Sequence, residues 1–300
     1  MTDGLSNPEA EYAKDPNIKK EDILALMEWA SKQAHLPHIT EYEFMLFYHC
    51  TGYSLQATKD IIDVHYDFKN YAPELFPGSF FNTALSNYNY WESAYTIDTK
   101  CVTEEKYRVI YAGLLDPSKF HCDKALLEFT KVMFMLTLKK GNCPGYVFVF
   151  DMKGMSLSHL STLSVTLLKN YLYFVQEAIP LKVKGLHMAN SNSFMEKLMI
   201  IMKPFLKKEL FDVIFMHSDM NKMFKTSNVK SEFLPKEVGG QSLVPRVELI
   251  AEVRSNLSTY KNEVHEMMEK RTDRRKRVSD NKFSYDVEVL NGSFRKLEVD

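Results

Sequence analysis

The chain has 300 residues, of which 45% are hydrophobic and 26% are charged, and its formal net charge is -1. A chain of this length can form a small helical domain and an α/β domain, each with its own core. The nearly balanced charge argues against a nucleic-acid-binding protein that depends on overall positive charge. No apolar stretch approaches the roughly 20 residues needed to cross a bilayer, so we expect any membrane contact to be peripheral.

The four cysteines are scattered without a C-x-x-C pair, and the polar N-terminus lacks the apolar core of a signal peptide. Both features predict a protein of the reducing cytoplasm. Residues 1–20 are polar throughout, which predicts a flexible N-terminus.

Helical periodicity begins after this segment and predicts a small all-α domain over residues 21–78. Apolar residues recur at helical spacing over 20–32, 41–49 and 60–68. A turn-rich stretch that contains Pro73 and Pro77 closes the domain. We expect the aromatic-rich segment 80–99 to pack between this domain and the next.

Residues 79–245 alternate predicted strands and helices. The run at 146–150 is continuously apolar, which is typical of a parallel strand covered on both faces. Further strands are predicted over 107–111, 183–188 and 213–216, and helices over 123–138, 158–177 and 194–202. This order predicts a mainly parallel sheet with right-handed crossovers and flanking helices. Residues 246–300 are predicted to form a C-terminal helix and a tail.

The short helix predicted over 194–202 has apolar side chains on nearly all of its faces. It is either a core helix buried on both sides or a lid that faces a cavity on one side and a membrane on the other. Its methionines, Met195, Met199 and Met202, suit varied or mobile apolar contacts. The pattern alone leaves both interpretations open.

The run 270–277 is rich in lysine and arginine. We interpret it as a solvated tail, with attraction to acidic lipids as the functional alternative. Nuclear targeting by the consecutive cations at 274–277 is a further alternative.

Motifs for hydrolysis, nucleotide binding and zinc proteolysis are absent from the sequence. His159, His187 and His217 could converge in the fold, but a metal site needs three or four ligands of compatible geometry, so structural histidines are the favoured interpretation. We therefore expect neither an enzyme nor a bound metal or cofactor. An esterase on this chain would need a serine, a base and an oxyanion hole.

Five separate motifs occur in a specific order between residues 151 and 240. They are Asp151-Met-Lys-Gly154, Pro180-Leu-Lys-Val-Lys-Gly-Leu-His-Met-Ala-Asn190, Phe194, Lys203-Pro-Phe-Leu206 and Leu234-Pro-Lys-Glu-Val-Gly-Gly240. This combination resembles the CRAL-TRIO (Sec14-like) lipid-binding domain, in the branch of α-tocopherol transfer protein and cellular retinaldehyde-binding protein. Segments 55–59 and 292–297 are similar to arthropod-type members of that branch.

The resemblance implies a CRAL-TRIO-N-like helical domain followed by a CRAL-TRIO domain, in which a mobile lid helix closes an apolar cavity. It implies intracellular transfer of a small hydrophobic lipid, such as a tocopherol, a retinoid, a carotenoid or another isoprenoid, with the lid opening at membranes. The lining residues that it implies are Tyr146, Phe148, Phe150, Leu163, Tyr171, Phe174, Val175, Ile179, Leu181, Val183 and Leu186, with Phe194, Leu198 and Ile201 on one face of the lid.

Large aromatic residues among these positions bear on the shape of the ligand. Phe148 and Phe150 would shorten the cavity, which favours a compact or planar ligand over a two-tailed phospholipid. Tyr146, Tyr171 and Tyr173 offer a hydroxyl that could orient one polar atom. A phospholipid or phosphoinositide exchanger and a membrane-trafficking adaptor with a vestigial cavity are the alternatives.

A basic patch for anionic phosphoinositide head groups is also implied by the resemblance. The candidate membrane-binding residues are Lys182, Lys184, Lys207 and Lys208. Glu209 and Val213 stand where the family often has basic residues, so we expect altered phosphoinositide selectivity. A general attraction to anionic surfaces, of about 1 kcal/mol per well-placed lysine, is expected to remain.

Overall fold

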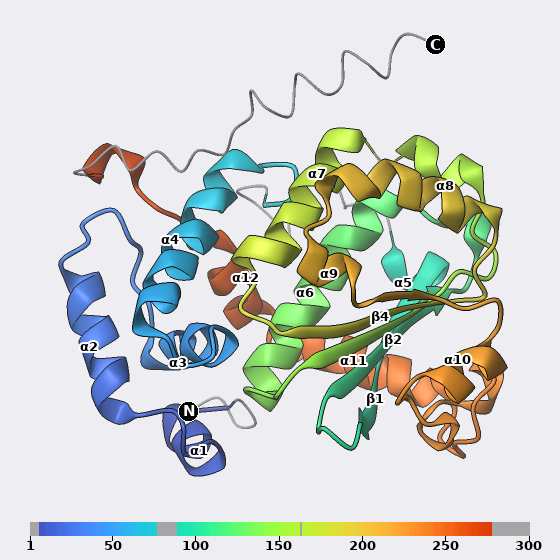
Figure 1. Ribbon diagram of the computed structural model, residues 1–300, viewed down its shortest axis with the longest axis horizontal. Coiled ribbons are helices and arrows are strands. Elements are labelled where there is room, and N and C mark those ends of the chain that lie inside the picture. Colours follow the sequence, from blue (N-terminus) through green and yellow to red (C-terminus); the bar gives the residue numbers. More distant parts are fainter. Residues whose placement is uncertain (1–5, 77–88, 163, 278–300) are drawn as a thin grey trace, which may run out of the picture.

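A computed structural model of the chain describes residues 6–76, 89–162 and 164–277. It is a mixed α/β structure in which a layer of N-terminal helices lies beside a sheet that has helices on both faces (Figure 1). Among the described residues, no helix has both the length and the apolar character needed to cross a bilayer.

The N-terminal layer contains α1 (Pro8–Lys14), α2 (Lys20–Ser31), α3 (Glu41–Cys50) and α4 (Leu55–Tyr71). Helix α3 begins where Thr40 and Glu43 form a capping box, and α4 begins where the Ser54 side chain accepts a hydrogen bond from the backbone of Ala57. The predicted helices are present, and α4 starts earlier than predicted because Ser54 caps it.

The prediction of a flexible N-terminus is wrong for the described residues 6–20. Helix α1 is anchored there by Glu11, whose buried carboxylate accepts a hydrogen bond of 2.9 Å from the backbone N–H of Asn142. The backbone N–H of Ser6 donates to the carbonyl of Leu138. These partners lie more than a hundred residues away in sequence, so local polarity gave no sign of them.

The sheet has five strands in the spatial order β1-β2-β3-β4-β5. The strands are β1 (Ala94–Val102), β2 (Arg108–Leu114), β3 (Tyr146–Asp151), β4 (Val183–Ala189) and β5 (Ile214–Met216). Strand β1 runs antiparallel to β2, and the other neighbours pair in parallel. The mainly parallel sheet is therefore confirmed. Strand β1 corrects the expectation that residues 80–99 are only a connecting segment.

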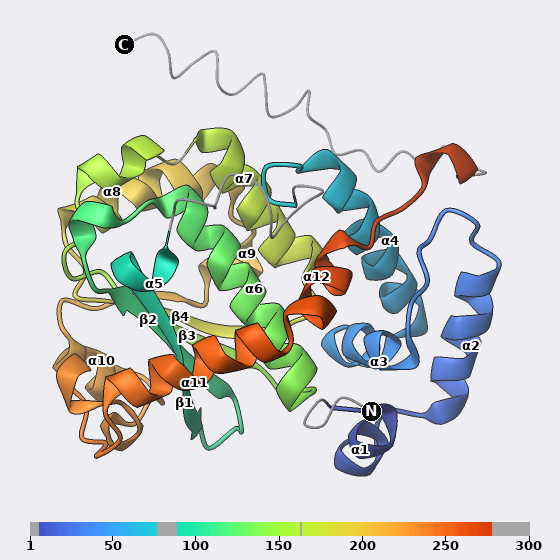
Figure 2. The same cartoon turned by 180° about the vertical axis from the view of Figure 1, so that it is seen from behind.

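The two faces of the sheet carry separate cores. On one face, Phe148 packs in a cluster with α6 (Cys122–Lys140) and with the C-terminal α12 (Lys261–Glu269). On the other face, Val147 and Val149 pack against α10 (Met220–Thr226) and α11 (Arg246–Thr259), as Figure 2 shows for α11. Alternate residues of β3 thus point to opposite faces, and both sets are apolar, as expected of a central strand.

The helix predicted over 158–177 is divided into three segments. A 3-10 segment (Leu157–Thr162) comes first, and α7 (Val165–Tyr173) begins where the Ser164 side chain accepts from the backbone of Leu167. A π-helical turn (Phe174–Ala178) then ends the element, and Ile179 donates to the carbonyl of Phe174. The prediction of one continuous helix is wrong because Ser164 starts a new helix.

Three short helices complete the described part of the fold. Helix α5 (Tyr90–Ser93) precedes β1, α8 (Ser193–Met202) follows β4, and α9 (Lys208–Phe211) leads into β5. Figure 1 shows α7 and α8 together on the same side of the sheet, with α10 and α11 on the other.

Residues 270–277, here called the C-terminal strap, lie against α3 and α4. Lys270 pairs with the buried carboxylate of Glu43 at 2.9 Å, and Arg277 pairs with Asp63 at 2.8 Å. Arg274 pairs with Asp67 at 3.1 Å. The interpretation of this run as a solvated tail is therefore wrong for Lys270, Arg274 and Arg277, which pair with acids of the N-terminal helices. Arg275 and Lys276 are exposed and pair with Asp273 within the strap.

Lys69 on α4 adds a buried contact to the same junction. Its ammonium donates to the carbonyl of Met267 at 2.6 Å and lies 5.1 Å from the centre of the Tyr66 ring. Burial lowers the pKa of Lys69 to about 7. The buried side chain of Lys69 thus links α4 of the helical layer to the end of α12.

Candidate functional site

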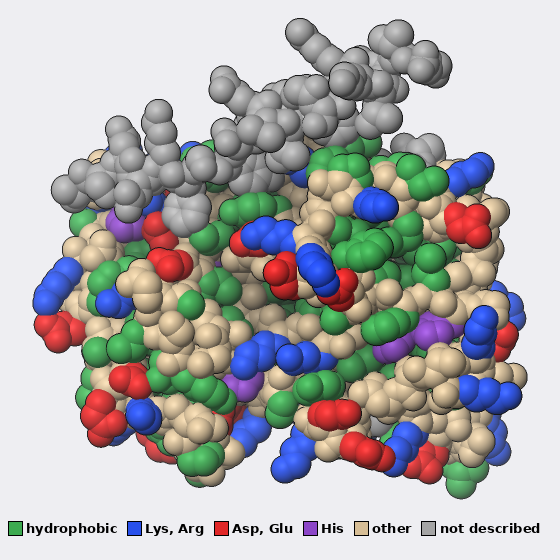
Figure 3. All heavy atoms as spheres, in the orientation of Figure 1, with side chains coloured by type: hydrophobic (Ala, Val, Ile, Leu, Met, Phe, Trp, Pro, Cys, Tyr) green, Lys and Arg blue, Asp and Glu red, His purple; other side chains and the backbone are tan. Residues whose placement is uncertain are grey.

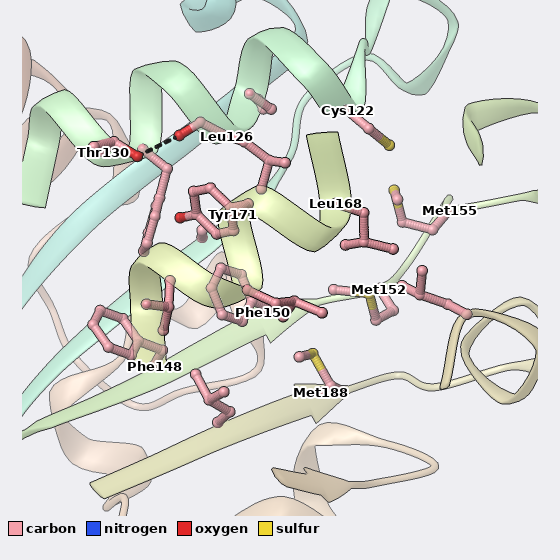
Figure 4. A pocket seen from close by; sticks show the side chains of 18 of the residues that line it. Cys122, Leu126, Thr130, Phe148, Phe150, Met152, Met155, Leu168, Tyr171 and Met188 are labelled. Carbon is pink, nitrogen blue, oxygen red and sulfur yellow. Dashed lines mark hydrogen bonds between the residues drawn. The ribbon is translucent and has the colours of Figure 1, made fainter. Parts of the chain in front are cut away.

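A cavity of about 260 Å³ lies between the sheet and the helices α6, α7 and α8. Its wall is almost wholly apolar, and Figure 4 shows side chains from helix and strand converging on it. The residues that line it are Tyr90, Ala94, Ala112, Gly113, Leu114, Phe120, Cys122, Ala125, Leu126, Phe129, Thr130, Met133, Phe148, Phe150, Asp151, Met152, Met155, Leu168, Tyr171, Leu172, Val175, Ile179, Leu181, Val183, Leu186, Met188, Met195, Leu198, Met202, Leu210 and Ile214.

The floor of the cavity is formed by one face of the parallel strands. In the register of the sheet, Phe148 pairs with Leu186, and Phe150 pairs with Met188 two residues later. Successive side chains of a strand point to opposite faces, so these four side chains share the cavity face. The parallel pairing therefore turns alternate apolar positions of β3 and β4 into one continuous surface.

Helix α6 forms a wall of the cavity. Leu126, Thr130 and Met133 follow one another at i, i+4 and i+7, which places them along one side of the helix. The Phe129 ring lies edge-on to Phe148, with ring centres 5.6 Å apart. The helix thus closes the space above the strands.

Polar atoms are few along this wall. The Tyr171 hydroxyl lies on the side of the cavity that faces α6, and burial raises its pKa to about 12, with the nearby Thr130 side chain opposing the shift. The Thr130 hydroxyl donates to the carbonyl of Leu126 at 2.8 Å (Figure 4). Elsewhere on the wall, Asp151 already accepts hydrogen bonds from Tyr111 and Asn190. Tyr171 is therefore the hydroxyl best placed to bind one polar atom of a ligand.

Helix α8 covers the cavity and also exposes apolar side chains, next to exposed Glu196 and Lys197. Met195 is 1% exposed and lines the cavity together with Leu198 and Met202. Ile200 is 72% exposed and Ile201 is 37% exposed on the outside. Of the two interpretations left open by the sequence, this arrangement favours a lid over a helix buried on both sides.

Nine of the implied lining residues lie on the cavity wall. They are Phe148, Phe150, Tyr171, Val175, Ile179, Leu181, Val183, Leu186 and Leu198.

Three others lie elsewhere, which corrects the implied set. Tyr146 is buried in the core, and Phe174 packs against Phe76 with ring centres 5.0 Å apart. Ile201 is on the outside of α8. Leu163 and the side chain of Phe194 lie outside what the structure describes.

Sequence reasoning missed the sulfur-containing residues of the wall. Met152 and Met155 come from the loop after β3, Met188 from β4 and Cys122 from the start of α6. The residues of α6 that line the cavity could have been predicted to share one face of a helix, because Leu126 and Thr130 stand at helical spacing. The loop methionines had no periodicity that could assign them to a site.

The candidate membrane-binding lysines fall into two kinds. Lys207 pairs with Glu177 and Lys208 pairs with Asp212, so their charges are already partly balanced. Lys182 is partly buried, with its ammonium 5.6 Å from the centre of the Tyr53 ring, and burial lowers its pKa.

Lys184 is exposed and lies 5.8 Å from the centre of the Tyr107 ring. Glu209 is exposed on α9, and Val213 is partly buried before β5. Of the predicted cations, Lys182 and Lys184 therefore remain the better candidates for contact with an anionic head group.

The three histidines considered as a metal site are not all brought together. His187 and His217 share a hydrogen bond of 2.9 Å between Nδ1 and Nε2, whereas His159 bonds the Pro117 carbonyl at 2.8 Å. Burial and the adjacent His217 lower the pKa of His187 to about 4. Within the part of the chain that the structure describes, no group of three or more His, Cys, Asp and Glu residues could hold a metal ion.

Two regions of the chain are similar to known protein families. Residues 104–240 match the family model described as CRAL/TRIO domain, and residues 15–79 match the one described as Pinta-like, UBA domain. Alpha-tocopherol transfer protein-like from Homo sapiens is 34% identical over 97 residues, which are 32% of this chain and 28% of that protein. Clavesin-1 from Mus musculus is 30% identical over 97 residues, which are 32% of this chain and 27% of that protein.

The solved structure of Sfh5 aligns with a TM-score of 0.49 and 15% identity, and covers 87% of this chain and 86% of that chain. The matched segment spans less than a third of the length of the curated relatives above.

Proposed function

Because residues 104–240 are a CRAL/TRIO domain, we propose that this protein binds one small apolar lipid in the cavity beneath α8 and transfers it between membranes. The observation that carries the proposal is an apolar cavity of about 260 Å³ covered by a helix that also exposes Ile200 and Ile201. We also propose that the protein acts in the cytoplasm and that it has no catalytic turnover.

The size of the cavity supports binding of an apolar molecule. An empty apolar cavity of 260 Å³ would lower the free energy of unfolding by about 6 kcal/mol, at about 24 cal/mol per Å³ of cavity volume. That cost is comparable with the whole stability of many domains, roughly 5–15 kcal/mol. An apolar occupant restores the lost contacts, so binding a lipid also stabilises the folded protein.

The shape and polarity of the cavity favour a compact ligand. Its volume is slightly below the roughly 300–1,000 Å³ of common ligand sites. This volume favours a tocopherol, a retinoid, a carotenoid fragment or another isoprenoid over a two-tailed phospholipid. The Tyr171 hydroxyl is suited to bind one polar atom, such as a ligand hydroxyl or carbonyl oxygen. The alternative of a phospholipid exchanger would require more polar groups than this wall offers to a head group.

Membrane contact would use the outer face of α8 and its neighbours. Exposed apolar residues of these elements are Ile200 and Ile201 on α8, Phe211 on α9, and Phe215 and Met216 on β5. Figure 3 shows hydrophobic side chains spread over this face of the molecule. When this face inserts into a bilayer surface, contacts with lipid would replace the contacts that hold α8 over the cavity. Lys182 and Lys184 would add attraction to anionic lipids, including phosphoinositides.

Native mass spectrometry of the purified protein, followed by extraction and identification of the bound lipid, tests this proposal. The protein is then offered tocopherol, retinaldehyde or phosphatidylcholine in vesicles, and the fraction that takes up each lipid is measured. We expect one apolar molecule per chain and preferential uptake of the compact isoprenoids.

The matched variants are Ala125→Phe, which fills the cavity, and Ala251→Phe, which places the same ring on the exposed face of α11. Uptake should be lost only in Ala125→Phe. Equal uptake by both variants, or no uptake by the unmodified protein, would favour the adaptor with a vestigial cavity. The assignment to an arthropod-type member of the family stays a prediction.

A further inference from the structure

One part of the cavity wall is built from sulfur-containing side chains. Met152, Met155, Met188 and Met195, here called the thioether cluster, pack against one another and all line the cavity. Met188 is 9% exposed and Met195 is 1% exposed. Figure 4 shows the sulfur atoms of Met152, Met155 and Met188 on the same side of the cavity as that of Cys122.

Apolarity alone does not require sulfur at these positions. Leucine fills a similar volume with better-defined rotamers, whereas a thioether is flexible, polarizable and open to oxidation. Methionine accepts one oxygen atom to form a sulfoxide in a two-electron reaction. Met188 and Met195 are buried against the cavity, so they are shielded from dissolved peroxide but open to an oxidant that enters as an apolar ligand, whereas Met152 and Met155 are half-buried.

We propose that the thioether cluster reduces lipid hydroperoxides that enter the cavity. A lone pair on sulfur attacks the terminal oxygen of the hydroperoxide, the O–O bond breaks and an S–O bond forms. The proton of the hydroperoxide passes to the oxygen that stays on the lipid, which leaves as an alcohol. The thioether is oxidised by two electrons and the hydroperoxide is reduced by two, so each methionine is consumed once and no further reactant is needed.

The cavity supplies the proximity that this slow reaction lacks in water. Binding in the cavity holds a hydroperoxide next to four thioethers, so the effective concentration of thioether is high. Little water is present there to separate the two reactants. A sulfoxide at buried Met188 or Met195 is polar and poorly hydrated among apolar side chains, which disfavours the packing of α8 through Met195. Oxidation is therefore expected to lower later uptake of lipid as well. The inference rests on the proposed function, because the oxidant reaches the cluster only if the cavity admits apolar molecules.

The test compares two oxidants on the full chain. Cumene hydroperoxide is compact and apolar, whereas hydrogen peroxide stays in water. Met216 serves as an internal control because it is 49% exposed and lies outside the cavity wall. Site-resolved mass spectrometry measures the sulfoxide at each methionine over time, and chromatography measures the alcohol formed.

With cumene hydroperoxide, we expect Met188 and Met195 to be oxidised about tenfold faster than Met216. With hydrogen peroxide the order should reverse, since the exposed thioether meets the oxidant first. The double variant M188L/M195L should lower alcohol formation by at least about half, while M27L on α2, outside the cavity wall, should leave it unchanged.

The internal comparison within the unmodified protein holds even if the double variant folds poorly. Faster oxidation of Met216 by both reagents would overturn the inference. Uptake of retinaldehyde from vesicles, measured on the same preparation, separates the two proposals. Uptake without oxidation of the cluster removes only this inference, and absence of both removes the lipid-binding function as well.

Discussion

Replacement of His187 by asparagine should reduce the dependence of stability on pH. His187 is 5% exposed on β4, and its Nδ1 shares a hydrogen bond with Nε2 of His217. The Phe215 ring stacks on it, and Lys222, Asp219 and Thr226 face His217 from α10 and the segment before it. An asparagine amide can keep a hydrogen bond to His217 but does not titrate.

The expected magnitude follows from the lowered pKa. Burial and His217 lower the pKa of His187 from 6.5 to about 4 in the folded protein. As the pH falls below 6.5, the unfolded chain binds a proton that the folded protein does not bind until about pH 4, so stability decreases over this interval. At about 1.4 kcal/mol per pH unit, His187 contributes about 3 kcal/mol at neutral pH, and this contribution is lost by about pH 4.

Urea denaturation at several values between pH 7.5 and pH 4 measures this contribution. Burial also lowers the pKa of His49 and His65, so the curve of the unmodified protein combines several groups. The difference between the unmodified protein and His187→Asn isolates the imidazole, and exposed His38→Asn is the matched control. A difference in unfolding free energy that stays constant across this pH range would refute the reasoning.

Further predictions concern the ligand, the strap and the lid. Tyr171→Phe should weaken binding of a hydroxyl- or carbonyl-bearing lipid about tenfold and leave a pure hydrocarbon unaffected, as measured by fluorescence titration. Glu43→Gln should lower the unfolding free energy by about 2 kcal/mol in urea denaturation, because Lys270 loses its buried partner and keeps only exposed Glu266, whereas Glu28→Gln, in an exposed pair with Lys32, should leave it nearly unchanged. Ile200→Asp on the outer face of α8 should slow transfer from vesicles with unchanged lipid affinity in solution; unchanged transfer would exclude α8 from the docking surface.

The local sequence pattern was sufficient to predict the central strands of the sheet but not the edge strand β1. The apolar run at 146–150 needed no distant partner to be recognised. Strand β1 was missed because it buries polar residues, and their partners are tertiary. The hydroxyl groups of Thr96 and Tyr90 lie 2.7 Å apart, and the Thr99 hydroxyl donates to the carbonyl of Val109. Polarity at these positions therefore indicated a connecting segment, although the residues are buried.

The cavity was predicted in part for a similar reason. The resemblance supplied strand residues such as Phe148 and Leu186, whose positions follow from the register of the sheet. The thioether cluster combines a loop, a strand and the lid, so no sequence period marks it. Likewise, the strap finds Asp63 and Asp67 about 200 residues earlier in the chain, and only the folded structure brings these charges together.

The position of the strap has a consequence for synthesis on the ribosome. Glu43, Asp63 and Asp67 belong to helices that emerge early, yet their cationic partners are among the last residues described. Domains of a growing chain generally fold from the N-terminus onward. Here the acids of the helical layer lack these partners until the strap has been synthesised. The cations of the strap therefore reach these acids only after the sheet and α12 have been synthesised.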